Sequence, residues 1–103
     1  MEHQDPIHDA SELDPTNVQE LGELCRALGN PVRVQMMRLL MERGSCICRE
    51  MVEALPLAQS TVSQHLKVLK EAHLVVGRVD GPRRSYSINP SQLKHFKALV
   101  QAL

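Results

Sequence analysis

Apolar residues recur every three or four positions along most of the chain from residue 18 onward, the spacing of helices with one buried face. Gly29, Gly44 and Pro56 interrupt this pattern, because glycine and proline end helices. Asn30 is suited to cap a second helix that has Pro31 at its first position. The predicted helices cover residues 18–28, 31–43, 46–55 and 58–72.

The expected buried stripes follow this spacing. They comprise Leu21, Leu24, Cys25 and Leu28 in the first helix, Val32, Met36, Leu39 and Leu40 in the second, and Val62, Leu66 and Leu69 in the fourth.

The period changes after His73. Residues 75–79 and 84–88 are rich in β-forming side chains, and Asp80-Gly81-Pro82 between them predicts a hairpin turn. Asn89-Pro90 then repeats the signal that begins the second helix. The predicted fold class is mainly α with a small β-hairpin: four helices, the hairpin and a last helix.

Charge divides the chain into two parts. Residues 1–24 hold seven acidic residues and no Lys or Arg, whereas the remainder holds twelve basic and five acidic residues, a surplus of seven positive charges. We expect an acidic, flexible arm over residues 1–16 and one folded domain over residues 17–103. A basic domain suits a polyanionic partner, although a solvated surface with a tail explains the charges equally well.

Composition narrows the classes of function. One Phe, one Tyr and no Trp leave little for stacking single-stranded bases or for an aromatic ligand pocket. No apolar run is long enough to span a membrane, and no signal peptide is visible. Three cysteines without an export signal predict free or metal-bound thiols in a cytoplasmic protein.

The third and fourth predicted helices, joined by a proline-containing turn, form a candidate helix-turn-helix for double-stranded DNA. Short polar side chains at the start of the second of these helices reach base edges and phosphates, and its N-terminus favours phosphate. The two arginines of the hairpin suit the DNA backbone or the minor groove. The candidate DNA contacts are Gln59, Ser60, Thr61, Ser63, Gln64, His65, Lys67, Arg83 and Arg84. The alternative for the fourth helix is an ordinary amphipathic helix.

Four stretches of the sequence closely resemble the ArsR/SmtB family: residues 27–33, 46–48, 55–69 and 72–75. The resemblance covers about residues 18–103. It implies a dimeric winged helix-turn-helix repressor that leaves operator DNA when it binds a metal or metalloid. The Cys46-Ile47-Cys48 motif resembles the arsenic- and cadmium-responsive branches of that family.

The chain also departs from the family. His73 stands where the family usually has glycine, so we expect a strained residue with positive φ there. Met51 replaces a third cysteine that the arsenic branch often carries. His95 has no nearby acids in the sequence, which argues against a zinc site on the last helix. For His65 we expect a structural or DNA-facing role.

Cys46 and Cys48 are the candidate ion ligands. Both are placed in the first turn of the third helix, where the helix dipole and Arg43 and Arg49 favour thiolates. A strict helix turns them roughly 200° apart, so chelation requires a distorted first turn. The alternative is that both are small buried hydrophobic residues.

Soft thiolates predict As(III) or Sb(III) as the inducer, with Cd(II), Pb(II) or Zn(II) as alternatives. Cys25 is a candidate third ligand but lies on a predicted apolar stripe, so it is equally a candidate core residue. His3 and His8 of the arm could complete a Zn(II) or Cd(II) site.

A thiol-redox repressor of the same fold and a metal-sequestering protein are the competing functions, and nothing favours an enzyme.

A homodimer is expected because the last helix carries an apolar stripe that so small a chain can hardly cover. The candidate interface residues are Leu21, Leu93, Phe96, Val100 and Leu103.

Overall fold

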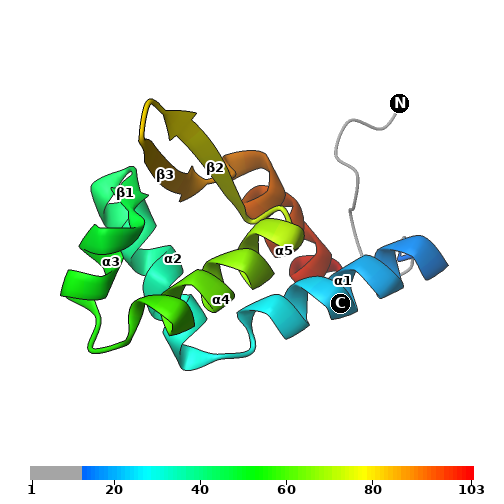
Figure 1. The fold of residues 1–103 in the computed structure, drawn as a ribbon. Coiled ribbons are helices and arrows are strands. Elements are labelled where there is room, and N and C mark those ends of the chain that lie inside the picture. The colour runs from blue at the N-terminus through cyan, green and yellow to red at the C-terminus, as the bar shows by residue number, and fades with distance from the viewer. Residues whose placement is uncertain (1–12) are drawn as a thin grey trace.

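The computed structural model describes residues 13–103, and it contains five helices and three strands in that range. The helices are α1 (Pro15–Leu28), α2 (Pro31–Arg43), α3 (Cys48–Ala54), α4 (Gln59–Glu71) and α5 (Pro90–Ala102). The strands are β1 (Cys46–Ile47), β2 (Val75–Asp80) and β3 (Arg83–Ile88). The hairpin β2–β3 projects from the helical body as a wing (Figure 1). The predicted fold class is therefore confirmed as a winged helix-turn-helix.

Three helices begin with the same device, an Asp or Asn followed by proline. Asp14 accepts a hydrogen bond from the Asn17 amide (2.8 Å), and Asn30 accepts one from the Val32 amide (2.8 Å). Asn89 caps α5 in the same way. The side-chain oxygen satisfies a free amide of the first turn, and proline removes another. Because Asp14 caps α1, the helix begins inside the segment that the sequence predicts as an arm.

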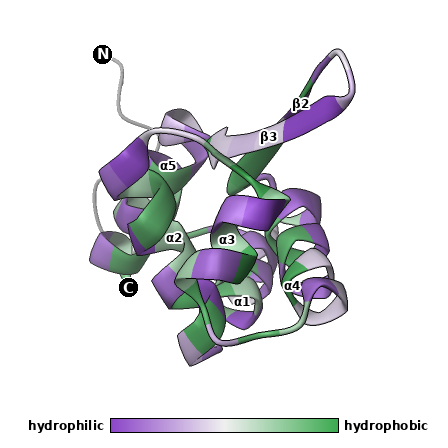
Figure 2. Ribbon diagram, turned by 60° about the vertical axis from the view of Figure 1, so that its left-hand side comes forward, coloured by the Kyte–Doolittle hydropathy of each residue, from purple (hydrophilic) through white to green (hydrophobic). Residues whose placement is uncertain are grey.

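The core lies where the helices meet the base of the wing. Each element except β3 contributes at least one fully buried side chain: Leu24, Leu40, Cys46, Met51, Leu69, Val75 and Leu99. Figure 2 shows the apolar helix faces turned inward and a largely hydrophilic outer half of the wing. The core thus fixes both the helix-turn-helix and the root of the wing.

The third strand, β1, is absent from the sequence-based prediction. It pairs with β3 in antiparallel register, Cys46 opposite Tyr86 and Ile47 opposite Ser85, so the sheet order is β1-β3-β2. The predicted third helix therefore starts two residues too early. The α3 helix begins at Cys48, and the Glu50 carboxylate accepts the Ile47 amide at 2.9 Å.

In α1 and α5 the residues that the chain itself buries differ from the apolar stripe of the sequence. In α1 the buried residue after Leu24 is Ala27, and Cys25 is exposed. In α5 the fully buried residues are Leu99 and Ala102, whereas Leu93 and Phe96 are half-buried. Each helix buries the face that its neighbours reach, which is narrower than the apolar pattern.

His73 adopts the left-handed conformation that the sequence predicts, with φ of 62°. It directly follows α4 and its C-cap residue, and its amide donates to the Lys70 carbonyl (2.9 Å). The Leu74 amide then reaches the Leu69 carbonyl (3.0 Å), which closes the end of the helix in the manner of a Schellman motif. This turn directs the chain from α4 into the wing.

None of the helices in the described range is long and apolar enough to cross a bilayer.

Candidate nucleic-acid interface and thiol site

The α4 helix presents a polar face to the outside. Its buried stripe is the predicted one, formed by Val62, Leu66 and Leu69. Of the predicted contacts on this helix, Thr61 and His65 are half-buried, and the exposed ones are Gln59, Ser60, Ser63, Gln64 and Lys67. Ala58 occupies the N-cap position and offers no side-chain acceptor, so no N-cap side chain bonds the amides of the first turn. Free amides at a helix N-terminus suit a phosphate group.

His65 is tied to the rest of the protein by Arg33. The Arg33 guanidinium lies 3.2 Å from His65 Nδ1 through Nη1 and also donates to the Ala27 and Arg26 carbonyls. Because arginine can only donate, Nδ1 of His65 is the acceptor in this contact. The contact gives His65 a structural role, joining α4 to the link between α1 and α2.

The wing carries the two predicted arginines at its tip. Gly81 takes a positive φ of 61° in the turn, which L side chains rarely adopt. Arg83 and Arg84 follow at once on β3, and both are exposed. Their side chains share the wing tip with Pro82 and are free of the helical core.

A cleft of about 330 Å³ separates the wing from the start of α3. Cys48 and Arg49 line it from α3, and Arg83, Arg84 and Tyr86 line it from β3. The sequence indicates Arg49 only as a neighbour of the thiols, and it gives no sign that Tyr86 lies near them. The pairing of β1 with β3 brings these residues together, and it joins positions about 40 residues apart in the chain.

Cys46 is not in a helical first turn, which corrects the sequence-based placement. It lies in β1 with 1% of its surface exposed. Burial, with a smaller effect from the Glu50 carboxylate, raises the pKa of the Cys46 thiol, and Arg43 only partly offsets this. The expected stabilisation of a thiolate at this position is therefore wrong: Cys46 is a neutral, buried thiol at neutral pH.

Cys48 is the first residue of α3 and is half-buried. Its Sγ lies 3.8 Å from Ser63 Oγ, on the exposed face of α4. This contact joins the candidate sensing thiol directly to the helix predicted to read DNA.

Cys25 is exposed on α1, so the expectation of a core cysteine there is not met. Among residues 13–103, no three Cys, His, Asp or Glu side chains are grouped so that they could hold an ion. The structure therefore does not bring Cys25 together with Cys46 and Cys48. His3 and His8 lie outside the described residues.

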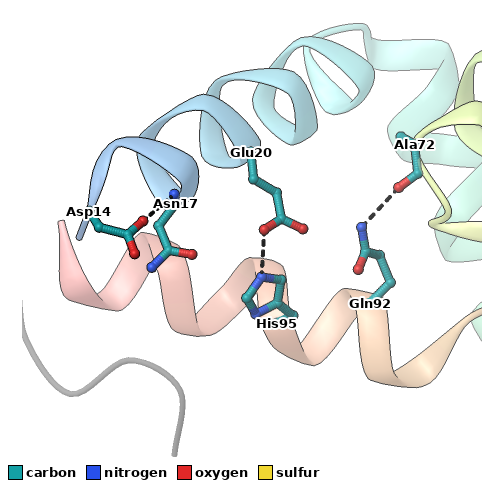
Figure 3. Close-up of polar contacts among 6 residues, drawn as sticks. All are labelled: Asp14, Asn17, Glu20, Ala72, Gln92 and His95. Atoms are coloured by element: carbon teal, nitrogen blue, oxygen red, sulfur yellow. Dashed lines mark hydrogen bonds and ion pairs between the residues drawn. The ribbon is translucent and has the colours of Figure 1, made fainter. Parts of the chain in front are cut away.

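His95 does have an acidic neighbour, contrary to the expectation from the sequence. Its Nε2 lies 2.9 Å from the Glu20 carboxylate of α1 (Figure 3). The Gln92 side chain donates to the Ala72 carbonyl at 3.0 Å on the same side of α5. The two contacts fix α5 against α1 and against the end of α4.

The residues predicted for a dimer interface have different exposures. Leu21 is enclosed by the chain's own core and offers little surface to a partner. Leu103 is 79% exposed and Val100 is 44% exposed, at the free end of α5. Val18, on α1, is also exposed.

Known proteins share this architecture and sequence. Residues 30–76 match the model of the arsR family of bacterial regulatory proteins. An HTH-type transcriptional regulator of Methanocaldococcus jannaschii is 35% identical over 86 residues, which cover 82% of this chain and 96% of the relative. The repressor SmtB of Mycobacterium tuberculosis is 43% identical over 75 residues, covering 73% of this chain and 55% of SmtB.

The solved structure of a possible transcriptional regulator for arsenical resistance superimposes with a TM-score of 0.70. It is 33% identical, and the match covers 76% of this chain and 80% of that one. Fold, helix-turn-helix and sequence therefore agree: the chain belongs to the ArsR family of DNA-binding transcriptional regulators.

Proposed function

We propose that this protein is a repressor that leaves its operator DNA when Cys46 and Cys48 bind As(III) or Sb(III). One observation carries the proposal: Cys48 Sγ lies 3.8 Å from Ser63 Oγ, so a ligand on this thiol reaches the helix that reads DNA. The similarity to a possible transcriptional regulator for arsenical resistance supports the choice of a metalloid.

The donor atoms suit a soft ion. Sulfur ligands prefer thiophilic ions to Mg(II) or Ca(II), and each cysteine gives up its proton on binding. Cys48 is accessible, whereas Cys46 is buried and neutral in β1. Cys48 therefore engages first, and Cys46 joins only when the two-residue strand β1 leaves β3.

The loss of β1 alters the support of the DNA reader. β1 leads directly into α3, and α3 packs against α4. Ion binding and DNA binding are coupled reciprocally, because each changes the affinity for the other by the same factor. Couplings of this kind generally amount to about 1–3 kcal/mol.

The DNA surface is formed by the outer face of α4 and by the wing. Ser60, Ser63 and Gln64 face the major groove, while Arg83 and Arg84 contact the backbone or the minor groove. The exposure of these five side chains supports the assignment.

The repressor is proposed to act as a homodimer through α1 and α5. Val18 is exposed on α1, and α5 carries the half-buried Leu93 and Phe96 and the exposed Val100, with the exposed Leu103 directly after it, which supports an apolar surface on these helices. A two-fold dimer presents two α4 helices to half-sites about one DNA turn apart. Sedimentation of wild type and Leu103→Asp tests this, and a wild-type protein that stays monomeric at micromolar concentration would contradict it.

The proposed function is tested on a labelled duplex from the protein's own promoter. The reduced protein is bound to the duplex and titrated separately with As(III), Cd(II), Pb(II) and Zn(II), while anisotropy reports release. Release by one As(III) ion for each pair of Cys46 and Cys48 supports the proposal. Release only by Cd(II), Pb(II) or Zn(II), or only by an oxidant, would contradict the metalloid assignment and favour a metal or redox sensor.

A further inference from the structure

Three of the seven residues that line the cleft between α3 and the wing are arginines, and none of the seven is acidic. Arg49 lines it from α3, and Arg83 and Arg84 line it from β3. The nearest acidic residue of α3, Glu50, is occupied at the start of that helix, where it accepts the Ile47 amide. A cleft of about 330 Å³ with this lining suits a phosphate group.

Cys48 joins this cleft to the reading face of α4. Its side chain forms part of the cleft wall, and its Sγ lies 3.8 Å from Ser63 Oγ. A duplex that follows the exposed face of α4 and contacts the wing must therefore pass over Cys48.

We infer that the cleft receives a backbone phosphate of the bound DNA and that Cys48 lies beneath it, so DNA and any group bonded to Cys48 compete for one space. The inference rests on the proposed DNA-binding function and adds the manner of release. A substituent on Cys48 removes DNA by occupying the cleft, in addition to any effect of moving α3.

Alkylation with iodoacetamide tests the inference without a metal. The Cys48 thiolate displaces iodide, so a sulfur–carbon bond forms, the carbon–iodine bond breaks and the thiol proton passes to buffer. DNA at about ten times its Kd leaves about one tenth of the protein free, so alkylation of Cys48 slows about tenfold in the complex. Peptide mass spectrometry measures each cysteine separately.

Cys25 is the internal control, because it is exposed on α1 and away from the cleft. Its alkylation rate stays the same with and without DNA. An equal rate at Cys48 in free and DNA-bound protein would overturn the inference.

The converse experiment uses two single variants. Cys25→Ser is alkylated at Cys48, and Cys48→Ser is alkylated at Cys25; each is compared with its own unmodified form. We expect the label on Cys48 to weaken binding to the promoter duplex about tenfold or more, through lost charge-assisted contacts, and the label on Cys25 to leave binding unchanged.

The possible failures are distinguishable. Unmodified protein that binds no promoter DNA would contradict the proposed function and the inference with it. Protein that binds DNA equally well with Cys48 alkylated or free would overturn the inference alone.

Discussion

Arg33 holds His65 by a 3.2 Å contact between Nη1 and Nδ1, across 32 positions of the sequence. The same guanidinium donates to the carbonyls of Ala27 and Arg26 at the end of α1. One side chain thus links the α1–α2 connection to the DNA-reading helix.

Replacing Arg33 with Met removes these donors while keeping most of the aliphatic stem. We expect the free energy of unfolding to fall by about 1–3 kcal/mol, because partly buried carbonyls lose charged donors. Urea denaturation measures this free energy of unfolding. The matched control is Arg38→Met, on the exposed face of the same α2 helix. Equal stability of the two variants would contradict the assigned role.

The His73→Gly variant should be more stable than wild type. His73 has φ of 62°, where a side chain costs about 1 kcal/mol and glycine costs little. Its own side chain is exposed, and its carbonyl, which accepts from Asn89, is retained. A gain of this size raises the Tm by about 4–8 °C in a chain this short. Ala72→Gly, one residue earlier at φ of −83°, should lower the Tm instead.

Stability should fall at alkaline pH because of Cys46. Its pKa in the folded protein is raised above the ordinary value of 9.0, chiefly by burial. The unfolded chain therefore loses the Cys46 proton at lower pH than the folded protein does. The contribution of Cys46 to the free energy of unfolding is complete below the pKa of the unfolded chain, and it declines as the pH rises through the pKa of the folded protein. The free energy of unfolding should decline more steeply above about pH 9 in wild type than in Cys46→Ala. Cys25→Ala, which removes an exposed thiol, is the control, and equal slopes for wild type and Cys46→Ala would contradict the prediction.

Arg84 and Gln64 should differ in what they contribute to DNA binding. Arg84→Ala removes a proposed phosphate contact, so it should weaken binding to all duplexes alike and make the salt slope shallower by about one unit. Gln64→Ala should alter sequence preference more than salt dependence. Titrations of promoter and unrelated duplexes at several salt concentrations measure both quantities. The same pattern in both variants would contradict this division.

The sequence predicts the helices well because their boundaries are local. Asn30-Pro31 and Asn89-Pro90 begin helices through contacts within three residues. In contrast, β1 is only two residues long and is a strand only because it pairs with β3. So short a segment has no periodic pattern of apolar residues from which it could be predicted.

The parts of the site that depend on tertiary packing could not be predicted. The exposure of Cys25 follows from which face of α1 meets its neighbours, and an apolar pattern places that face only to within a residue. The Glu20–His95 contact joins positions 75 residues apart. The proximity of Arg49 to Arg83 and Arg84 likewise requires β3 to pair with β1 at the start of α3.

The most direct test of the sensing site compares three cysteine variants on DNA. Cys46→Ser, Cys48→Ser and Cys25→Ser are each bound to the promoter duplex and titrated with As(III), and release is expressed relative to each variant's own ion-free affinity. We expect Cys46→Ser and Cys48→Ser to stay on DNA, because a single remaining thiol binds As(III) too weakly to displace the duplex, whereas Cys25→Ser is released like wild type. Release of Cys48→Ser at the As(III) concentration that releases wild type would contradict it.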